Sequence, residues 1–189
     1  SINSVLLQDY SNYEHIIIDG GSTDNTIEIL NHYKHLNWIS ERDNGPANAI
    51  NKGLFKVEGD VIAWINSDDY YNNDVFSLVM DIFNTHTLID FVYGNLTFVS
   101  ENKEIILSDK TPQYSFEFLA NYYADAIRQP AIFFRRALFE KIGYLDENLK
   151  VVFDYDFFLR MIKIAKPYYL DHNIAFVRDY KGTITRKNL

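Results

Sequence analysis

The chain has 189 residues, of which 47% are hydrophobic, 16% aromatic and 23% charged. This composition is typical of one globular domain with a packed core and excludes a disordered chain. A formal net charge of −8 with scattered Lys and Arg argues against nonspecific nucleic-acid binding, which needs clustered cations. The sequence has no cysteine, which excludes disulfides and Cys-ligated metal centres and fits a reducing compartment. No apolar run approaches the ~20 residues of a membrane-spanning helix, so we expect a soluble protein.

The first ninety residues alternate short apolar runs with amphipathic stretches. Residues 1–7 have the pattern of the end of a helix, and the apolar runs that follow predict strands over residues 15–19, 36–40 and 61–65. Each run is followed by a predicted helix: one that begins at an N-cap among residues 22–25 and runs through about residue 33, and others over about residues 46–56 and 73–83. Alternating strands and helices with short loops predict an α/β fold, with a mostly parallel central sheet flanked by helices.

After residue 90 the pattern changes. Residues 91–99 and 104–107 are predicted as two strands joined by a short turn, which indicates a small antiparallel insertion. The remaining predicted elements are helices over residues 115–123, 136–142 and 154–165 and strands over residues 131–134, 168–170 and 174–177. Because linkers and repeats are absent from the sequence, we predict a single domain over residues 1–189.

Acidic side chains follow each of the three predicted strands of the first half. Asp19 follows the first, Glu41 and Asp43 the second, and Asp68 and Asp69 the third. Ligands of open α/β sheets bind at the carboxyl ends of strands, so this edge is a candidate site. Two interpretations of the Asp68–Asp69 pair stay open: a divalent cation on one carboxylate with a hydroxyl on the other, or a solvated turn that caps the next helix.

A second acidic pair, Asp154 and Asp156, stands at a predicted helix start among large apolar residues. Positions two apart on a helix do not share a face, so the two carboxylates should have different roles. Partial burial would raise a carboxylate pKa and suit a general base, whereas the structural alternative is an N-cap, with Asp156 paired to Arg160. The histidines show no metal-ligand spacing beyond the pair His32 and His35, and are expected at the surface.

Five blocks of sequence, in order and at similar spacing, closely resemble the family 2 glycosyltransferases, which have the GT-A fold. The blocks are YEHIIIDGGSTDNTIEIL (13–30), ISERDNGPANAINKGL (39–54), GDVIAWINSDDYY (59–71), RQPAIFFRRALFEKIGYLDENL (128–149) and FDYDFFLRM (153–161). The resemblance divides the domain into a nucleotide-sugar-binding half, residues 1–90, and an acceptor and catalytic half, residues 91–189.

The resemblance implies a role for individual residues. Asp154 matches the catalytic base, and Asp69 matches the ligand of a divalent cation, Mn²⁺ or Mg²⁺. The residues matching the nucleotide-sugar site are Asp19 on the base with Ser22 nearby, Asp43 in the flanking loop, Asn51, and Asp68 on the ribose. The residues matching the acceptor side are Gln129, Pro130 and Asp156. Two positions depart from the family pattern: Asn66 replaces the first acid of Asp-x-Asp, and Tyr180 replaces a metal-binding His, for which Asp179 is a candidate substitute.

The implied reaction is inversion by single displacement. Asp154 takes the proton of an acceptor hydroxyl while that oxygen attacks the anomeric carbon of a nucleotide-diphosphate sugar, most simply a UDP-sugar. The implied acceptor is a glycan or lipid-linked glycan in glycan or cell-surface polysaccharide synthesis. The implied location is the cytoplasm, with peripheral association at the inner face of the membrane as a further expectation. The sequence leaves the oligomeric state open.

Members of this family begin with an apolar strand in the middle of the sheet, and no such strand precedes residue 15. We therefore expect either an N-terminally truncated chain or a sheet with unsatisfied strand edges, which favour association. The alternative functions are an inactive or binding-only GT-A domain and, with less support, a nucleotidyltransferase. Calorimetry with UDP and Mn²⁺ partly distinguishes an inactive or binding-only domain from an active enzyme. A Gly-rich loop on the first strand would indicate a nucleotidyltransferase.

Overall fold

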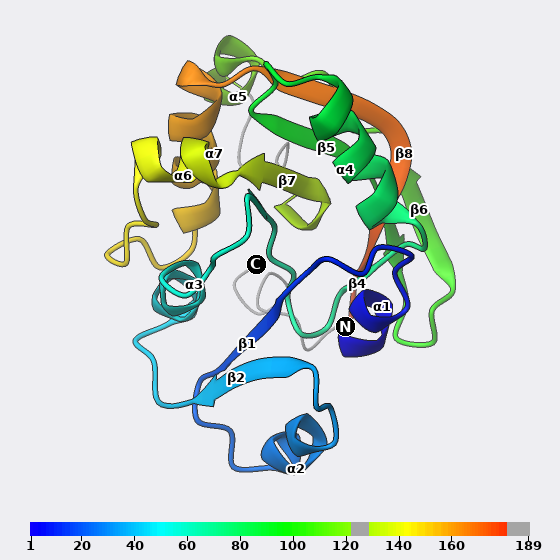
Figure 1. Cartoon of the computed structure of the whole chain (residues 1–189), viewed down its shortest axis with the longest axis vertical. Helices are drawn as coiled ribbons and strands as arrows, with labels where there is room; N and C mark the ends of the chain where they lie inside the picture. The colour runs from blue at the N-terminus through cyan, green and yellow to red at the C-terminus, as the bar shows by residue number, and fades with distance from the viewer. Residues whose placement is uncertain (122–128, 181–189) are drawn as a thin grey trace.

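The computed structural model describes residues 1–121 and 129–180 (Figure 1). In chain order the elements are α1 (Ile2–Leu6), β1 (His15–Asp19), α2 (Thr26–Asn31), β2 (Leu36–Ser40), α3 (Pro46–Leu54), β3 (Val61–Ile62), β4 (Tyr70–Tyr71), α4 (Val75–Thr85), β5 (Phe91–Val99), β6 (Ile105–Asp109), α5 (Phe116–Asn121), the 3-10 helix η2 (Gln129–Ala131), β7 (Ile132–Arg135), α6 (Arg136–Ile142), α7 (Phe153–Ile164) and β8 (Pro167–Arg178). No helix in these described ranges is long and apolar enough to cross a bilayer.

The strands form two separate sheets. β1 and β2 pair in parallel, from His15 opposite Leu36 to Asp19 opposite Ser40. The larger sheet has the order β3-β7-β5-β8-β4, with β6 paired to β5. Within it β5 and β8 are parallel, and the other pairs are antiparallel. The α/β prediction is confirmed, but the mostly parallel sheet is corrected to a mixed one.

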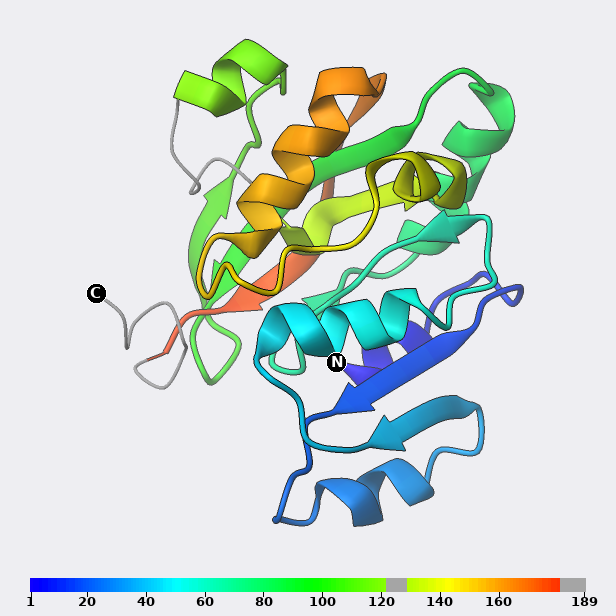
Figure 2. The ribbon, with the colours of Figure 1, turned by 90° about the vertical axis from the view of Figure 1, so that its left-hand side faces the viewer.

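Strand β5 lies in the middle of the larger sheet, because its sequence is apolar on both faces. Phe91 and Tyr93 belong to one hydrophobic cluster, with Phe157 of α7, while Val92 belongs to the other, with Val79 of α4. Figure 2 shows α7 and α4 on opposite sides of this sheet. The predicted antiparallel hairpin is present, but β5 is a core strand and β6 alone is the peripheral addition.

Two predicted strands differ from the observed ones. The strand expected over residues 61–65 is reduced to β3, because its partner β7 offers Phe134 and Arg135 to Ile62 and Val61 and then leads back into η2. The two strands expected over residues 168–170 and 174–177 are one strand, β8, whose pairing with β5 shifts register around Gly94 and Asn95. Part of the helix expected over residues 115–123 lies outside the described residues.

Candidate functional site

The turn after β1 is organised by the buried carboxylate of Asp19. It accepts hydrogen bonds from the Gly21 and Ser22 amides at 3.1 and 3.0 Å, from the Ser22 hydroxyl at 2.5 Å and from the Ser40 hydroxyl at 2.6 Å. Burial raises the pKa of Asp19, but these hydrogen bonds together hold it below its usual value. Asp19 is therefore an ionised carboxylate that shapes its own loop, next to the exposed side chain of Ser22.

The loop after β2 packs against the loop after β1. A Cβ added to Gly20 would lie 2.4 Å from Oδ2 of Asp43, so only a glycine allows this approach. The other oxygen of Asp43 accepts a hydrogen bond from the Gly45 amide at 2.9 Å, one residue before the Pro46 that opens α3. The structure thus brings Asp19, Ser22 and Asp43 together at the carboxyl ends of β1 and β2, as the sequence predicts.

Asp68 and Asp69 lie in a turn closed by a hydrogen bond from the Asp69 amide to the Asn66 carbonyl at 3.2 Å. Asp69 is 3% exposed and accepts hydrogen bonds from the Arg178 amide at 3.1 Å and the Asn66 side chain at 3.4 Å. Burial, and then the charge of Asp68, raise its pKa to about 6. The Arg178 guanidinium donates to the Asp68 carbonyl and lies over the Tyr70 ring. The last residue of β8 thus fixes this turn.

The donor set of this turn suits a divalent cation in part. The Asp68 carboxylate is half-buried and takes no hydrogen bond from the described residues, and it adjoins the buried carboxylate of Asp69. Paired carboxylates are the oxygen donors that Mg²⁺ and Mn²⁺ prefer. Across the described part of the chain, however, no group of three or more His, Asp or Glu side chains gathers around one point. A cation here would need ligands beyond these acidic side chains.

Asp154 lies in the first turn of α7 and is half-buried. Burial raises its pKa above the usual value, against the effect of the Tyr155 amide, which donates to its Oδ1 at 2.8 Å. The N-cap residue Val152 makes no side-chain cap hydrogen bond. A carboxylate with a raised pKa at a partly open position accepts a proton more readily than an ordinary Asp does, which suits a general base.

A stack of aromatic rings connects α7 to the segment that ends at Asp68. Trp64 lies face to face with Phe158 at a centroid distance of 5.4 Å and edge to face with Phe157 at 5.5 Å. Gln129, which is buried next to buried Pro130, donates to the Trp64 carbonyl at 2.5 Å. These contacts hold η2, α7 and the approach to Asp68 together.

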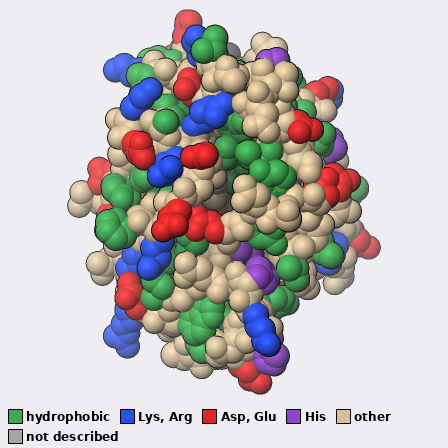
Figure 3. All heavy atoms as spheres, viewed as in Figure 1, with side chains coloured by type: hydrophobic (Ala, Val, Ile, Leu, Met, Phe, Trp, Pro, Cys, Tyr) green, Lys and Arg blue, Asp and Glu red, His purple; other side chains and the backbone are tan. Residues whose placement is uncertain are grey.

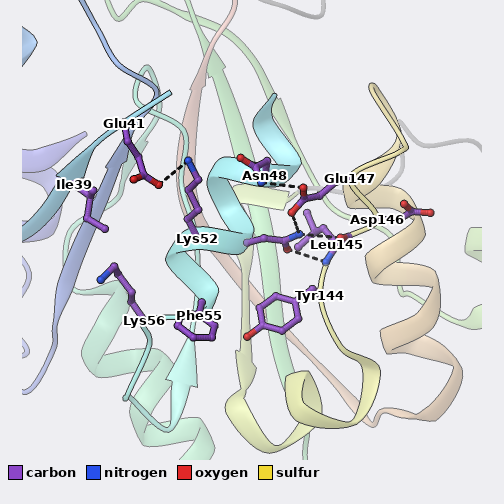
Figure 4. A pocket seen from close by; sticks show the side chains of 11 residues that line it. Ile39, Glu41, Asn48, Lys52, Phe55, Lys56, Tyr144, Leu145, Asp146 and Glu147 are labelled. Carbon is purple, nitrogen blue, oxygen red and sulfur yellow. Dashed lines mark hydrogen bonds and ion pairs between the residues drawn. The ribbon is translucent and has the colours of Figure 1, made fainter. Parts of the chain in front are cut away.

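Asn51 of α3 and Asp156 of α7 form structural hydrogen bonds near the segment that joins α6 to α7. Asn51 donates to the Leu145 carbonyl at 2.9 Å and to Glu147 at 2.8 Å, and accepts from the Leu145 amide at 3.0 Å (Figure 4). Asp156 accepts from Arg160 at 2.9 Å, as the structural alternative predicts, and Arg160 donates to the carbonyls of Ile142 and Tyr144. Both residues hold the segment that precedes α7.

An open pocket of about 700 Å³ lies beside this segment, and Figure 4 shows the side chains that line it. Its rim includes the Glu41–Lys52 ion pair, at 2.8 Å, and the rings of Tyr144 and Phe55. Figure 3 shows basic side chains scattered among acidic ones over the face seen in Figure 1.

The sequence patterns did not reveal the site residues that are contributed by distant positions in the chain. Arg178 reaches Asp69 across 109 positions and Ser40 reaches Asp19 across 21, and a pattern read along the chain gives no sign of either contact. His15 was expected at the surface and is 9% exposed, because it opens β1 and its ring lies 5.6 Å from that of His35. No hydrogen bond or ion pair between described residues joins the Asp19 turn to the Asp68–Asp69 turn.

Comparison with known proteins gives relatives over most of the chain. An uncharacterized glycosyltransferase of Rickettsia typhi is 28% identical over 198 residues, which cover all of this chain and 62% of the relative. An uncharacterized glycosyltransferase of Haemophilus influenzae is 31% identical over 97% of this chain and 74% of the relative. A PGL/p-HBAD biosynthesis glycosyltransferase of Mycobacterium bovis is 28% identical over 84% of this chain and 62% of the relative.

Among solved structures, S. aureus TarS 1–349 in complex with UDP-GlcNAc aligns with a TM-score of 0.78 at 21% identity, over 96% of this chain and 54% of TarS. This likeness shows the GT-A type of fold. The chain thus spans 62% of the length of the Rickettsia relative and about half of TarS 1–349. A family model for glycosyl transferase family 2 matches residues 1–143. That match covers the three sequence blocks between residues 13 and 71, and with them the Asp19, Asp43 and Asp68–Asp69 loops, and it spans more than half of the chain, which therefore belongs to glycosyl transferase family 2.

Proposed function

We propose that this protein is an inverting glycosyltransferase that moves a sugar from a nucleotide-diphosphate sugar to a hydroxyl group of a glycan or lipid-linked glycan. The observation that carries the proposal is the position of Asp154. Its half-buried carboxyl group, with a raised pKa, opens a helix that Trp64 ties to the Asp68–Asp69 turn. Family membership supports sugar transfer in general, and the nucleotide-sugar donor is supported by the solved structures of TarS with UDP and UDP-GlcNAc.

In this proposal Asp154 accepts the proton of the acceptor hydroxyl. The freed oxygen attacks the anomeric carbon as the bond to the diphosphate breaks, which inverts the configuration at that carbon. The Asp19 and Asp43 loops hold the nucleotide, with Ser22 at its edge, and Asp68 holds the ribose. Gln129, Pro130 and Asp156 belong to the acceptor side. A cytoplasmic location, with the acceptor at the inner face of the membrane, is part of the same proposal.

A divalent cation, Mn²⁺ or Mg²⁺, would be held by Asp69 and would supply positive charge to the leaving diphosphate. The turn around Asp69 supports this role in part, because the Arg178 and Asn66 hydrogen bonds fix the carboxylate, and the remaining ligands would come from the diphosphate and water. Asp69 needs a favourable neighbour when ionised, since its pKa is raised to about 6 by burial and by Asp68.

The decisive experiment measures release of nucleoside diphosphate by the purified protein with UDP-sugar, Mn²⁺ and a panel of hydroxyl acceptors. The Asp154→Asn variant should lose at least about 10²-fold in turnover, the usual contribution of a general base, while it still binds UDP. The matched control is Asp81→Asn, which removes an exposed carboxylate of α4. Full activity of Asp154→Asn would remove Asp154 as the base. Binding of UDP by a parent protein that never turns over would favour the binding-only alternative.

A further inference from the structure

The turn between β5 and β6 lies at the same edge of the larger sheet as the Asp68–Asp69 turn. Val99, the last residue of β5, pairs with Arg178, the last residue of β8. The Arg178 amide donates to the Asp69 carboxylate at 3.1 Å, and the Arg178 guanidinium donates to the Asp68 carbonyl. Figure 2 shows the β5–β6 turn next to the end of β8. This turn, residues 100–104, therefore lies beside the proposed donor site.

The backbone of the β5–β6 turn holds a lysine in a conformation that favours glycine. The Ser100 amide donates to the Glu104 carbonyl at 2.8 Å, and the Lys103 amide donates to the Ser100 carbonyl at 2.9 Å. Lys103 has a φ of +65°, in the left-handed region. Hairpin turns usually have Gly or Asn at such a position, because a Cβ is strained there. A role of the Lys103 side chain accounts for a lysine at this place.

Two cationic side chains lie over the ring of Tyr70. The Nζ atom of Lys103 is 5.8 Å from the centroid of this ring, and the Cζ atom of Arg178 is 5.3 Å from the same centroid. The ring itself is held in place by Phe176, on which it stacks at a centroid distance of 4.8 Å. Tyr70 directly follows Asp69 in the chain. The ring thus holds both cations next to the proposed cation site.

Neither of these two cations forms an ion pair with a carboxylate of residues 1–121 or 129–180. The side chain of Lys103 is exposed, and the guanidinium of Arg178 donates to a backbone carbonyl. The charges of Lys103, Arg178, Asp68 and Asp69 all act on the amino group of Ser1, so the four groups lie within electrostatic reach of one point. Two like charges held near one ring repel each other, and a bound anion would offset that repulsion.

We propose that Lys103 is a donor-binding residue, whose ammonium group hydrogen-bonds the diphosphate of the nucleotide sugar and, with Arg178, supplies positive charge to it in addition to the divalent cation. This inference rests on the proposed function, which places a diphosphate at this turn. Phosphate oxygens accept charge-assisted hydrogen bonds from Lys and Arg, and the flexible stem of a lysine lets its head follow the ligand. Because Asn66 stands in place of an acidic residue, the cation has fewer protein ligands, and fixed positive charge at Lys103 offsets that loss.

The test measures the Kd of UDP and of uridine, which lacks the phosphates, by NMR titration of the 189-residue chain in the presence of EDTA. Lys103→Asn removes the charge with a residue that tolerates the left-handed backbone. We expect this variant to raise the Kd of UDP at least about tenfold, because a hydrogen bond to a charged group is lost, and to leave the Kd of uridine unchanged. Lys103→Arg, which keeps the charge, should retain most of the UDP affinity. With Mn²⁺ in place of EDTA the effect of Lys103→Asn should be smaller, because the cation shares the charge of the diphosphate.

Two further variants separate ligand binding from a structural role. Lys110→Asn makes the same substitution just beyond the other end of β6, where the lysine pairs with Asp171 at 2.9 Å, and should leave UDP binding unchanged. Lys103→Gly suits the turn, so it should raise the Tm while it weakens UDP binding. An unchanged Kd of UDP in Lys103→Asn, or an equal loss of UDP and uridine binding, would overturn this inference alone if the parent binds and releases UDP in turnover. A parent that binds no UDP would overturn the proposed donor as well.

Discussion

Trp64 stacks on Phe158 with an angle of 10° between the ring planes. Trp64 precedes Asp68 by four residues, and Phe158 follows Asp154 by four residues, which places Phe158 and Asp154 on the same face of α7. One ring contact therefore sets the position of the proposed base relative to the proposed cation site.

Removal of the Trp64 ring should loosen both sides of the site. We expect Trp64→Ala to lower the free energy of unfolding by about 3 kcal/mol, because the contacts with Phe157 and Phe158 are replaced by a cavity. Urea denaturation measures this change. The matched control is Phe55→Ala, whose ring is 80% exposed and whose loss should change stability by less than about 0.5 kcal/mol. Equal effects of the two variants would show that the Trp64 stack is not a structural tie.

The pH dependence of the reaction should report on Asp154. A base acts when deprotonated, so kcat/KM falls as the pH drops through the pKa of Asp154. Because burial raises that pKa, the fall should begin at a higher pH than an ordinary Asp, of pKa about 3.9, would give. The Asp154→Glu variant should show a similar fall in kcat/KM at acidic pH, at lower overall activity. The Asp81→Asn variant should leave the pH profile unchanged. A fall in kcat/KM at the ordinary pKa of Asp would contradict the assignment of Asp154 as the base.

Asp69 should make the cation-free protein less stable as the pH rises. Its pKa is about 6 in the folded chain and about 3.9 when unfolded, so the unfolded state loses its proton first. The free energy of unfolding therefore decreases between about pH 4 and pH 6, by up to about 3 kcal/mol, and stays lower above that range.

The variant Asp69→Asn isolates this effect. With a chelator present it should be more stable than the parent at pH 8, by up to about 3 kcal/mol, and equally stable near pH 4. Mn²⁺ should then stabilise the parent at pH 8 but not the variant, because a bound cation favours the ionised carboxylate. Chemical denaturation at the two pH values measures both effects. A variant that is less stable than the parent at pH 8 would show that Asp69 is held mainly by its hydrogen bonds to Arg178 and Asn66.

The order of strands and helices could be predicted from the sequence, because it depends on local patterns. Apolar runs at 15–19 and 91–99 and Gly143 after α6, with its φ of +76°, mark elements wherever they occur. Strand pairing depends on contacts far apart in the chain. Thus the mixed sheet, the central place of β5 and the short β3 were not predictable from periodicity.

The candidate site shows the same difference between local sequence patterns, which are predictable, and contacts between distant positions, which are not. The acidic positions at strand ends were predictable, and the structure brings Asp19 and Asp43 together through the close approach at Gly20. What the sequence could not supply is the partner of each carboxylate. Ser22 and Ser40 donate to Asp19, and such hydrogen bonds hold its pKa below the usual value, whereas burial and the charge of Asp68 raise the pKa of Asp69 despite the bond from the Arg178 amide.

Asn51 and Asn48 offer a matched pair for the segment that leads into α7. Asn51 makes three hydrogen bonds to Leu145 and Glu147, whereas Asn48 makes one exposed bond to Glu147, at 2.9 Å, and accepts one from the Asn44 amide. We expect Asn51→Ala to cost about 1–3 kcal/mol of unfolding free energy, because the amide of buried Leu145 loses its acceptor, and Asn48→Ala to cost less than about 1 kcal/mol.

Asn51→Asp sharpens this comparison. The new carboxylate still accepts from the Leu145 amide, but it cannot donate to the Leu145 carbonyl and stands beside Glu147, with which Asn51 makes a 2.8 Å contact. Repulsion between two carboxylates exists only when both are ionised, so this variant should be less stable at pH 7 than at pH 4.5, relative to the parent. Urea titrations at both pH values measure the difference. If Asn51→Asp were as stable as the parent at pH 7, Asn51 would not be what holds residues 145–147 in place before Asp154.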